Sequence, residues 1–266
     1  MTALVMLVAV AIGTFALAWW LQERLIFFPQ PLASTGPLPP RVEPLEVIAT
    51  DGVRLRGWIR RSTGEPAPAV IAFGGNAEEI SALLADSHWP RDFAIVAVNY
   101  RGYGESEGKP GERALYADAV AIHDAIGRRA DVDAQRIIVF GRSLGTAVAV
   151  HLAAVRPVAG VILVSPFDSL TAIGRQHYPW LPVAWLLRHR FDAAILARGN
   201  RMPLHVIVGD ADTLVPVARS RVLFDAWAGP KDWQVVRGAN HNDVATYDTF
   251  WPGIVAFLRE RAAMRS

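Results

Sequence analysis

Ser143 stands in the run Gly141-Arg142-Ser143-Leu144-Gly145, between the apolar stretch Ile137–Phe140 and a helix-like stretch that begins at Thr146. A strand, a tight Gly-x-Ser-x-Gly turn and a helix would lift the serine hydroxyl clear of the backbone. The helix N-terminus would set partial positive charge and free amides beside a developing oxyanion. The pattern predicts that Ser143 is a nucleophile; the alternative is a tight turn with an incidental serine.

A serine hydroxyl is a weak nucleophile near neutral pH, so it needs a general base. His241 is the predicted base, because it lies in a loop that follows the β-rich run Trp233–Val236 and precedes the last helix-like stretch. The remaining histidines are expected in surface or packing positions on helices, on a strand or in an insertion. They are His88, His123, His151, His177, His189 and His205.

Two carboxylates compete to orient the histidine, both in the loop after the β-rich run Leu204–Val208. Asp210 adjoins Gly209 at the strand end, where an aspartate commonly serves a turn or a helix cap. Asp212 lies further into the loop and could reach toward His241 on the next strand. We therefore predict that Asp212 holds the imidazole tautomer and stabilises the imidazolium that forms.

Acyl transfer also needs two amide donors for the tetrahedral oxygen. The amide that follows the nucleophile, at Leu144, supplies the first. The β-rich run Ala69–Phe73 leads into Gly74-Gly75-Asn76, where paired glycines would let the backbone approach a substrate. We predict the Asn76 amide as the second donor; the alternative is a plain glycine-rich turn.

All these residues follow predicted strands, so a sheet must position them. Short β-rich runs, most without alternation, occur at Ala69–Phe73, Ala94–Asn99, Arg136–Phe140, Val161–Val164, Leu204–Val208 and Trp233–Val236. Helix-like stretches lie at Ala77–Leu84, Gly111–Arg129, Thr146–Val155, Pro216–Ala228 and Asp243–Arg261. An antiparallel hairpin around Asp51-Gly52 precedes them. The alternation predicts an α/β fold, with a mostly parallel central sheet and helices on both faces.

The composition fits one large globular domain and excludes several classes of protein. The 266 residues are 52% hydrophobic and 20% charged, which excludes disorder. The net charge is +2 and no basic run occurs, so no nucleic-acid partner is expected. With no cysteine, the chain has no disulfide, cysteine–zinc site or cysteine nucleophile. We expect no metal and no organic cofactor.

The stretch Thr2–Leu21 carries no charged side chain, and a helix of that length spans about 30 Å, the thickness of a hydrocarbon core. We therefore predict residues 1–22 as a single-pass transmembrane anchor, with localisation at a membrane of undetermined side. The alternatives are a buried helix or a cleaved signal peptide that ends near Ala16-Leu17-Ala18. Residues 23–44 are expected to form a linker, and residues 45–266 the catalytic domain.

These motifs resemble the α/β-hydrolase superfamily, which uses the same chain order of serine, acid and histidine. Several segments resemble one branch, the single-pass membrane-anchored α/β-hydrolase-domain proteins that include protein depalmitoylases. The segments are Leu25-Ile26-Phe27-Phe28-Pro29, Gly74-Gly75-Asn76-Ala77, 99–108, 141–145, 165–170, 209–216 and 240–243. The resemblance covers essentially the whole chain and implies the α/β-hydrolase fold with a small helical cap.

Carried over by position, the resemblance also implies a catalytic triad of Ser143, Asp212 and His241. It implies an oxyanion hole made by the Asn76 and Leu144 amides.

One position departs from the branch, which commonly has His-Gly-Asn where this chain has Gly74-Gly75-Asn76. The missing histidine is not a triad member, so the departure concerns how this loop is held. Arg101 and Tyr103 are expected to brace the nucleophile turn rather than to touch substrate.

The insertion at about residues 168–200 is expected to form the cap. Its aromatic and aliphatic residues would suit an acyl chain, although they could equally pack the cap onto the core. The predicted function is hydrolysis of a small-molecule or acyl-protein ester or thioester through a Ser143 acyl-enzyme. The alternatives are a serine peptidase or aminopeptidase with the same triad, and a catalytically silent interaction domain on a membrane anchor. The sequence predicts no oligomeric state.

Overall fold

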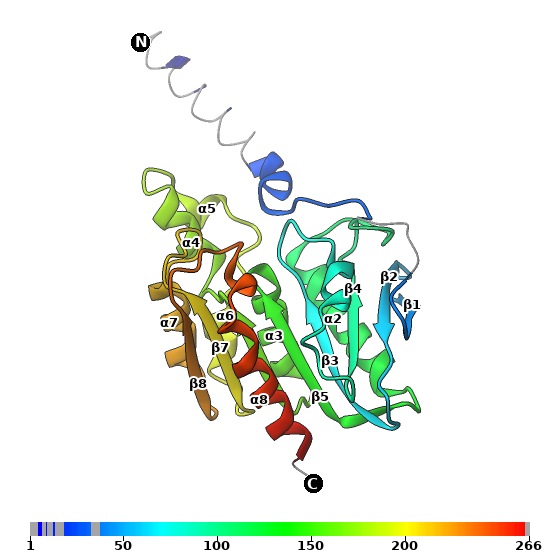
Figure 1. Cartoon of the computed structure of the whole chain (residues 1–266). Helices are drawn as coiled ribbons and strands as arrows, with labels where there is room; N and C mark the ends of the chain where they lie inside the picture. The colour runs from blue at the N-terminus through cyan, green and yellow to red at the C-terminus, as the bar shows by residue number, and fades with distance from the viewer. Residues whose placement is uncertain (1–4, 7–8, 10–12, 14–18, 33–37, 264–266) are drawn as a thin grey trace.

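The β-rich runs form neighbouring strands of one sheet in the computed structural model, which describes residues 5–6, 9, 13, 19–32 and 38–263. Within these residues the strand order is β1-β2-β4-β3-β5-β6-β7-β8 (Figure 1). The strands are β1 Val42–Ile48, β2 Arg54–Arg60, β3 Ala67–Phe73, β4 Ala94–Val98, β5 Val132–Arg142, β6 Gly160–Val164, β7 Leu204–Gly209 and β8 Lys231–Val236. β1, β2 and β4 pair antiparallel, and the remaining pairs are parallel.

The inner strands are buried on both faces, which explains their unbroken apolar runs. Along β5, Ile137 and Val139 point into one hydrophobic cluster, whereas Ile138 and Phe140 point into a second one. The first cluster lies under helices α2 Glu112–Gly127, α3 Leu144–Val155, α6 Ala193–Ala197 and α7 Val217–Ala226. The second lies under η1 Ile80–Ala85 and α8 Phe250–Ala263 (Figure 1). Helices therefore cover both faces of the sheet, and the predicted fold class is confirmed.

Two predicted helices differ from the structure. The stretch Ala77–Leu84 forms only the 3₁₀ helix η1, which begins at Ile80. The Glu79 side chain caps this helix by accepting the Ser81 N–H, and the Asn99 side chain accepts the Ile80 N–H. The stretch Asp243–Arg261 divides into the short 3₁₀ helix η2 Val244–Thr246 and α8. The insertion after β6 holds α4 Leu170–His177 and α5 Val183–Leu186 before α6.

The structure contradicts the predicted localisation at a membrane through a single-pass N-terminal anchor. In the part of the chain that is described, no helix is long and apolar enough to cross a membrane. Most of the stretch Thr2–Leu21 lies outside the described residues. Residues 19–26 are helical, and the charged residues Glu23 and Arg24 fall within this helix. Its Gln22 is 5% exposed and hydrogen-bonds the insertion, so this helix makes polar contacts with the domain.

Candidate active site

Ser143 occupies a strained turn between β5 and α3. Its φ of 51° and ψ of −118° lie outside the regions that L-residues favour, at a cost of about 1–3 kcal/mol. The turn closes because Gly145 has no side chain: a Cβ there would lie 2.1 Å from the carbonyl oxygen of Phe73. A hydrogen bond from the Ser143 amide to the Val164 carbonyl (2.9 Å) ties the turn to β6. The serine therefore stands at the carboxyl end of the parallel strands.

His241 reaches this serine from the loop after β8. Its Nε2 lies 2.9 Å from the Ser143 Oγ, and its Nδ1 lies 2.7 Å from an Asp212 carboxylate oxygen. The three residues are 7%, 8% and 6% exposed, respectively. The structure thus brings the three side chains into one hydrogen-bonded chain, from strands β5, β7 and β8.

Asp212, rather than Asp210, contacts the histidine. Its second carboxylate oxygen accepts the backbone N–H groups of Leu214 (2.9 Å) and Val215 (2.8 Å). Burial raises the pKa of the Asp212 carboxyl, but the hydrogen bonds from His241 and Val215 lower it further, so the pKa lies below its ordinary value. Asp212 is therefore ionised at neutral pH and accepts the Nδ1–H of His241. The exposed Asp210 instead accepts the Gly238 N–H in a turn.

The Gly74-Gly75-Asn76 loop lies beside Ser143. A Cβ on Gly75 would come within 3.8 Å of the Ser143 Cβ, so this glycine keeps the backbone close to the nucleophile. Among the described residues, the amide N–H groups of Asn76 and Leu144 have no acceptor. Both predicted donors are therefore free to bind a substrate oxygen.

Glu78 holds the glycine loop where the expected histidine is absent. Its carboxylate accepts the Gly75 N–H (2.7 Å) and pairs with the Arg142 guanidinium (3.0 Å). The other end of the same Arg142 guanidinium donates to the His241 carbonyl (3.1 Å). Arg142 therefore joins the nucleophile turn, the glycine loop and the histidine loop. Sequence reasoning missed both residues; the charge of Arg142, next to the nucleophile, was the one available signal.

Arg101 and Tyr103 brace other parts of the molecule than the nucleophile turn. The Arg101 guanidinium pairs with Asp118 on α2 and with Asp51 in the hairpin. The Tyr103 hydroxyl donates to the Asn76 carbonyl (2.6 Å). The expectation for these two residues is corrected: Tyr103 supports the glycine loop, and Arg101 ties the hairpin to α2.

The insertion lies next to the acid loop and exposes aromatic rings. The His177 ring at the end of α4 hydrogen-bonds the Leu214 carbonyl (3.0 Å), two residues beyond Asp212. Tyr178, Trp180 and Trp185 follow and are 53%, 73% and 88% exposed. The insertion thus contacts the Asp212 loop through His177 and exposes three aromatic rings.

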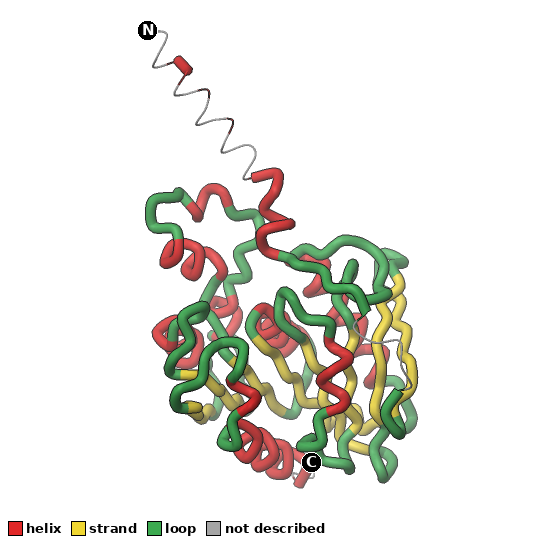
Figure 2. Tube along the Cα trace, turned by 45° about the horizontal axis from the view of Figure 1, so that its top comes forward, coloured by secondary structure: helices red, strands yellow, loops and turns green. Residues whose placement is uncertain are grey.

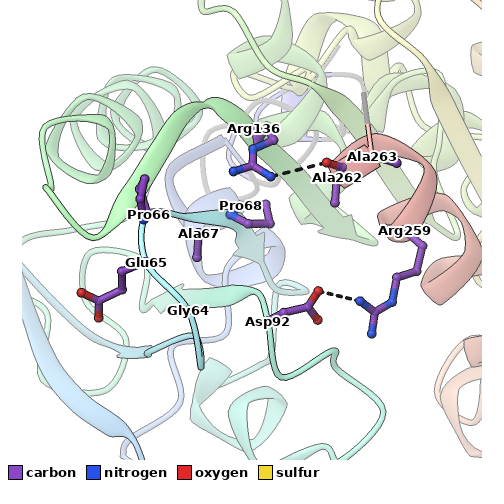
Figure 3. A pocket seen from close by; sticks show the side chains of 10 residues that line it. All are labelled: Gly64, Glu65, Pro66, Ala67, Pro68, Asp92, Arg136, Arg259, Ala262 and Ala263. Carbon is purple, nitrogen blue, oxygen red and sulfur yellow. Dashed lines mark hydrogen bonds and ion pairs between the residues drawn. The ribbon is translucent and has the colours of Figure 1, made fainter. Parts of the chain in front are cut away.

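Two cavities in the described chain lie apart from Ser143. One of about 480 Å³ adjoins the first residues of β3 and the end of α8, at the opposite end of the sheet from Ser143 (Figure 3). Its charged residues have partners: Arg259 pairs with Asp92 (2.5 Å), and Arg136 donates to the Ala262 carbonyl (3.4 Å). The second, of about 600 Å³, lies between the start of α2 and residues 188–192. No group of three acidic, histidine or cysteine side chains suited to a metal occurs among the described residues.

Comparisons with known proteins agree with this geometry. A family model described as the alpha/beta hydrolase fold matches residues 70–194. The uncharacterized protein MT2364 of Mycobacterium tuberculosis is 40% identical, over 98% of this chain and 95% of its own length. The chain belongs to the α/β-hydrolase superfamily. Alpha/beta hydrolase domain-containing protein 17B of Xenopus laevis, another relative in this superfamily, is 32% identical over 62% of this chain and 56% of its own length.

A solved esterase structure shares the fold at low identity. The Pyrococcus furiosus esterase Pf2001 superposes with a TM-score of 0.68 and 19% identity, over 89% of this chain and 98% of that one. This likeness shows that the two chains share their fold. The membrane-anchored branch is not supported, because no described helix supplies the anchor.

Proposed function

We propose that this protein is a serine hydrolase that cleaves carboxylic esters or thioesters through an acyl-enzyme on Ser143. The observation that carries the proposal is the hydrogen-bonded chain from the Ser143 Oγ through His241 to Asp212. Catalysis is assigned to residues 45–266, with residues 168–200 as the cap. The esterase activity named for the Pyrococcus furiosus neighbour supports the same reaction class.

The reaction begins when the Ser143 Oγ attacks the substrate carbonyl carbon and His241 Nε2 takes the hydroxyl proton. The ionised Asp212 stabilises the imidazolium that results. The carbonyl oxygen becomes an oxyanion and accepts hydrogen bonds from the Asn76 and Leu144 amides. No group outside the chain is required for these proton transfers.

The tetrahedral intermediate then collapses, and the bond to the leaving oxygen or sulfur breaks. His241 returns its proton to that leaving alcohol or thiol, which leaves an acyl group on Ser143. Water attacks the acyl group with His241 again as base, and the acid departs as Ser143 regains its proton. Each cycle therefore consumes one water and restores the starting protonation.

A hydrophobic acyl group is the proposed substrate class. The insertion contacts the Asp212 loop through His177 and exposes the rings of Tyr178, Trp180 and Trp185, and aromatic rings can bury large areas of an acyl chain. A comparison of short- and long-chain p-nitrophenyl esters and acyl-thioesters tests this class. We expect kcat/KM to rise with chain length; a preference for short, water-soluble acyl groups would contradict it.

The nucleophile itself is tested with a fluorophosphonate probe. We expect wild-type protein to be labelled at one serine, and Ser143→Ala to lose both labelling and on the order of 10⁴-fold or more in turnover. Ser87→Ala is the control, because Ser87 is an exposed serine in a turn before β4, away from the carboxyl ends of the strands. Labelling that persists in Ser143→Ala would refute the assignment.

A further inference from the structure

The peptide that carries the Asn76 amide lies between two peptides that are fixed by hydrogen bonds. On one side, the Gly74 carbonyl accepts the Tyr100 hydroxyl (2.9 Å), and the Gly75 N–H is held by Glu78 (2.7 Å). On the other side, the Asn76 carbonyl accepts the Tyr103 hydroxyl (2.6 Å) and the Phe28 N–H (3.0 Å). The direction of the free Asn76 N–H therefore depends on these neighbours.

The Phe28 N–H belongs to residues 22–30, here called the N-terminal strap, which makes further contacts with this loop and its neighbours. The Asn76 side-chain amide donates to the Ile26 carbonyl (2.9 Å), and the Phe28 N–H also donates to the Tyr103 hydroxyl (3.1 Å). The Gly104 N–H donates to the Gln30 carbonyl (2.8 Å). The strap is thus hydrogen-bonded both to the glycine loop, at Asn76, and to Tyr103 and Gly104.

Tyr103 suits the task of a fixed donor. Its side chain is fully buried, and burial raises the pKa of its phenol well above the ordinary value. The hydroxyl therefore keeps its proton at any physiological pH and donates it to the Asn76 carbonyl. Tyr100 packs against its ring edge-on, with 5.7 Å between ring centroids, so the phenol cannot turn away without moving the core.

The other end of the strap is fastened to the cap. The Gln22 side chain accepts the Arg188 N–H (2.7 Å) and donates to the Leu186 carbonyl (3.2 Å). Phe27 is buried and meets the rings of His189 and Phe191 edge-on. The strap consequently runs from the cap to the glycine loop and contacts both (Figure 2).

We propose that the N-terminal strap positions the Asn76 amide for the oxyanion, with Tyr103 as the positioning residue that joins strap and loop. This inference rests on the proposed acyl transfer at Ser143. On this inference, residues 22–30, which precede the catalytic domain, help to position its oxyanion hole. Since the hole acts on the transition state, displacement of the amide lowers kcat and leaves KM nearly unchanged.

The test compares full-length Tyr103→Phe and Asn76→Ala with wild type. Tyr103→Phe removes one hydroxyl, and Asn76→Ala removes the bond to Ile26 while it keeps the backbone amide. Tyr116→Phe is the matched control, since it deletes a tyrosine hydroxyl that has no hydrogen-bond partner among the described residues. Each protein is assayed with a p-nitrophenyl ester and with its thionoester, in which sulfur replaces the carbonyl oxygen and accepts hydrogen bonds poorly.

We expect Tyr103→Phe and Asn76→Ala to lower kcat on the ester about tenfold or more, and to lower the preference for ester over thionoester by a similar factor. KM should stay within about twofold, and Tyr116→Phe should match wild type in both measures. Unchanged kcat in both Tyr103→Phe and Asn76→Ala would overturn the inference. A fall in kcat with an unchanged ester preference would do so too, because it indicates a merely structural role.

The wild-type measurement distinguishes failure of this inference from failure of the proposed function on which it rests. Wild-type protein that neither hydrolyses the ester nor takes up fluorophosphonate at Ser143 would overturn the proposed function, and the inference with it. If wild type is active and labelled while Tyr103→Phe and Asn76→Ala keep the wild-type kcat, only the inference is overturned.

Discussion

The two halves of the site are positioned by different means. Ser143, Asp212 and His241 each follow a parallel strand, so the hydrogen-bonded sheet itself brings them to one edge. The glycine loop also follows a strand, but its orientation depends on side chains from Glu78, Tyr103 and the strap. The first half is therefore a property of the sheet, whereas the second is a property of long-range polar contacts.

The largest effect is expected from a change in the first half of the site, at Asp212. Asp212→Asn cannot hold His241 in the tautomer with a protonated Nδ1, so kcat should fall by about 10⁴-fold. Asp210→Asn, two residues away in a turn, is the control and should retain nearly full activity. Steady-state hydrolysis of a p-nitrophenyl ester measures both. Equal losses in the two variants would show that the histidine is oriented by something else.

A smaller effect is expected when the glycine loop is released. Glu78→Ala frees the Gly75 N–H and leaves Arg142 without its carboxylate partner, so kcat should fall about 10–100-fold. Glu65→Ala removes a surface carboxylate that pairs with Arg61 at the far end of the sheet, and activity should persist. If Glu78→Ala lowers kcat as much as Asp212→Asn does, the two halves of the site are not positioned by different means.

The smallest expected effect is a pH dependence of the unfolding free energy. The folded-state pKa of Asp212 lies below its unfolded value of about 3.9, so its ionised form stabilises the fold above that pH. This stabilisation is lost as pH falls through the folded pKa. The difference in unfolding free energy between wild type and Asp212→Asn should therefore shrink as pH drops below about 4.

Tyr100→Phe is the control for that experiment, because it removes an uncharged group. It removes a hydroxyl that holds the Gly74 carbonyl and carries no charge in this range, so its stability difference from wild type should not change with acid. Urea denaturation at stepped pH measures both differences. A stability gap for Asp212→Asn that widens in acid would contradict the lowered pKa.

The sheet and the residues at its strand ends could be predicted because their signals are local. Unbroken apolar runs indicate strands buried on both faces, and Gly-x-Ser-x-Gly after such a run predicts a strained turn. Asp212 and His241 were found by their places after strands, and the structure brings both to Ser143. Their catalytic roles stay predictions that the variants above test.

The contacts that hold the glycine loop could not be predicted, since they join residues far apart in the chain. Arg142 and Glu78 are separated by 64 positions, and Tyr103 and Phe28 by 75. No period or motif in the sequence indicates such pairs. The predicted membrane localisation is wrong on a different ground: no helix in the described part of the chain is long and apolar enough to cross a membrane.

The strap also makes the two ends of the chain unequal as points of attachment. Residues 19–26 lie against the cap, whereas α8 ends beside the first residues of β3, at the far end of the sheet (Figure 1). A fluorescent protein or a solid support coupled ahead of the strap would pull on Gln22 and Phe28. The same cargo coupled after α8 would lie at the opposite end of the sheet from Ser143. For immobilisation, biosensing or display, the C-terminal end is the point of attachment to choose.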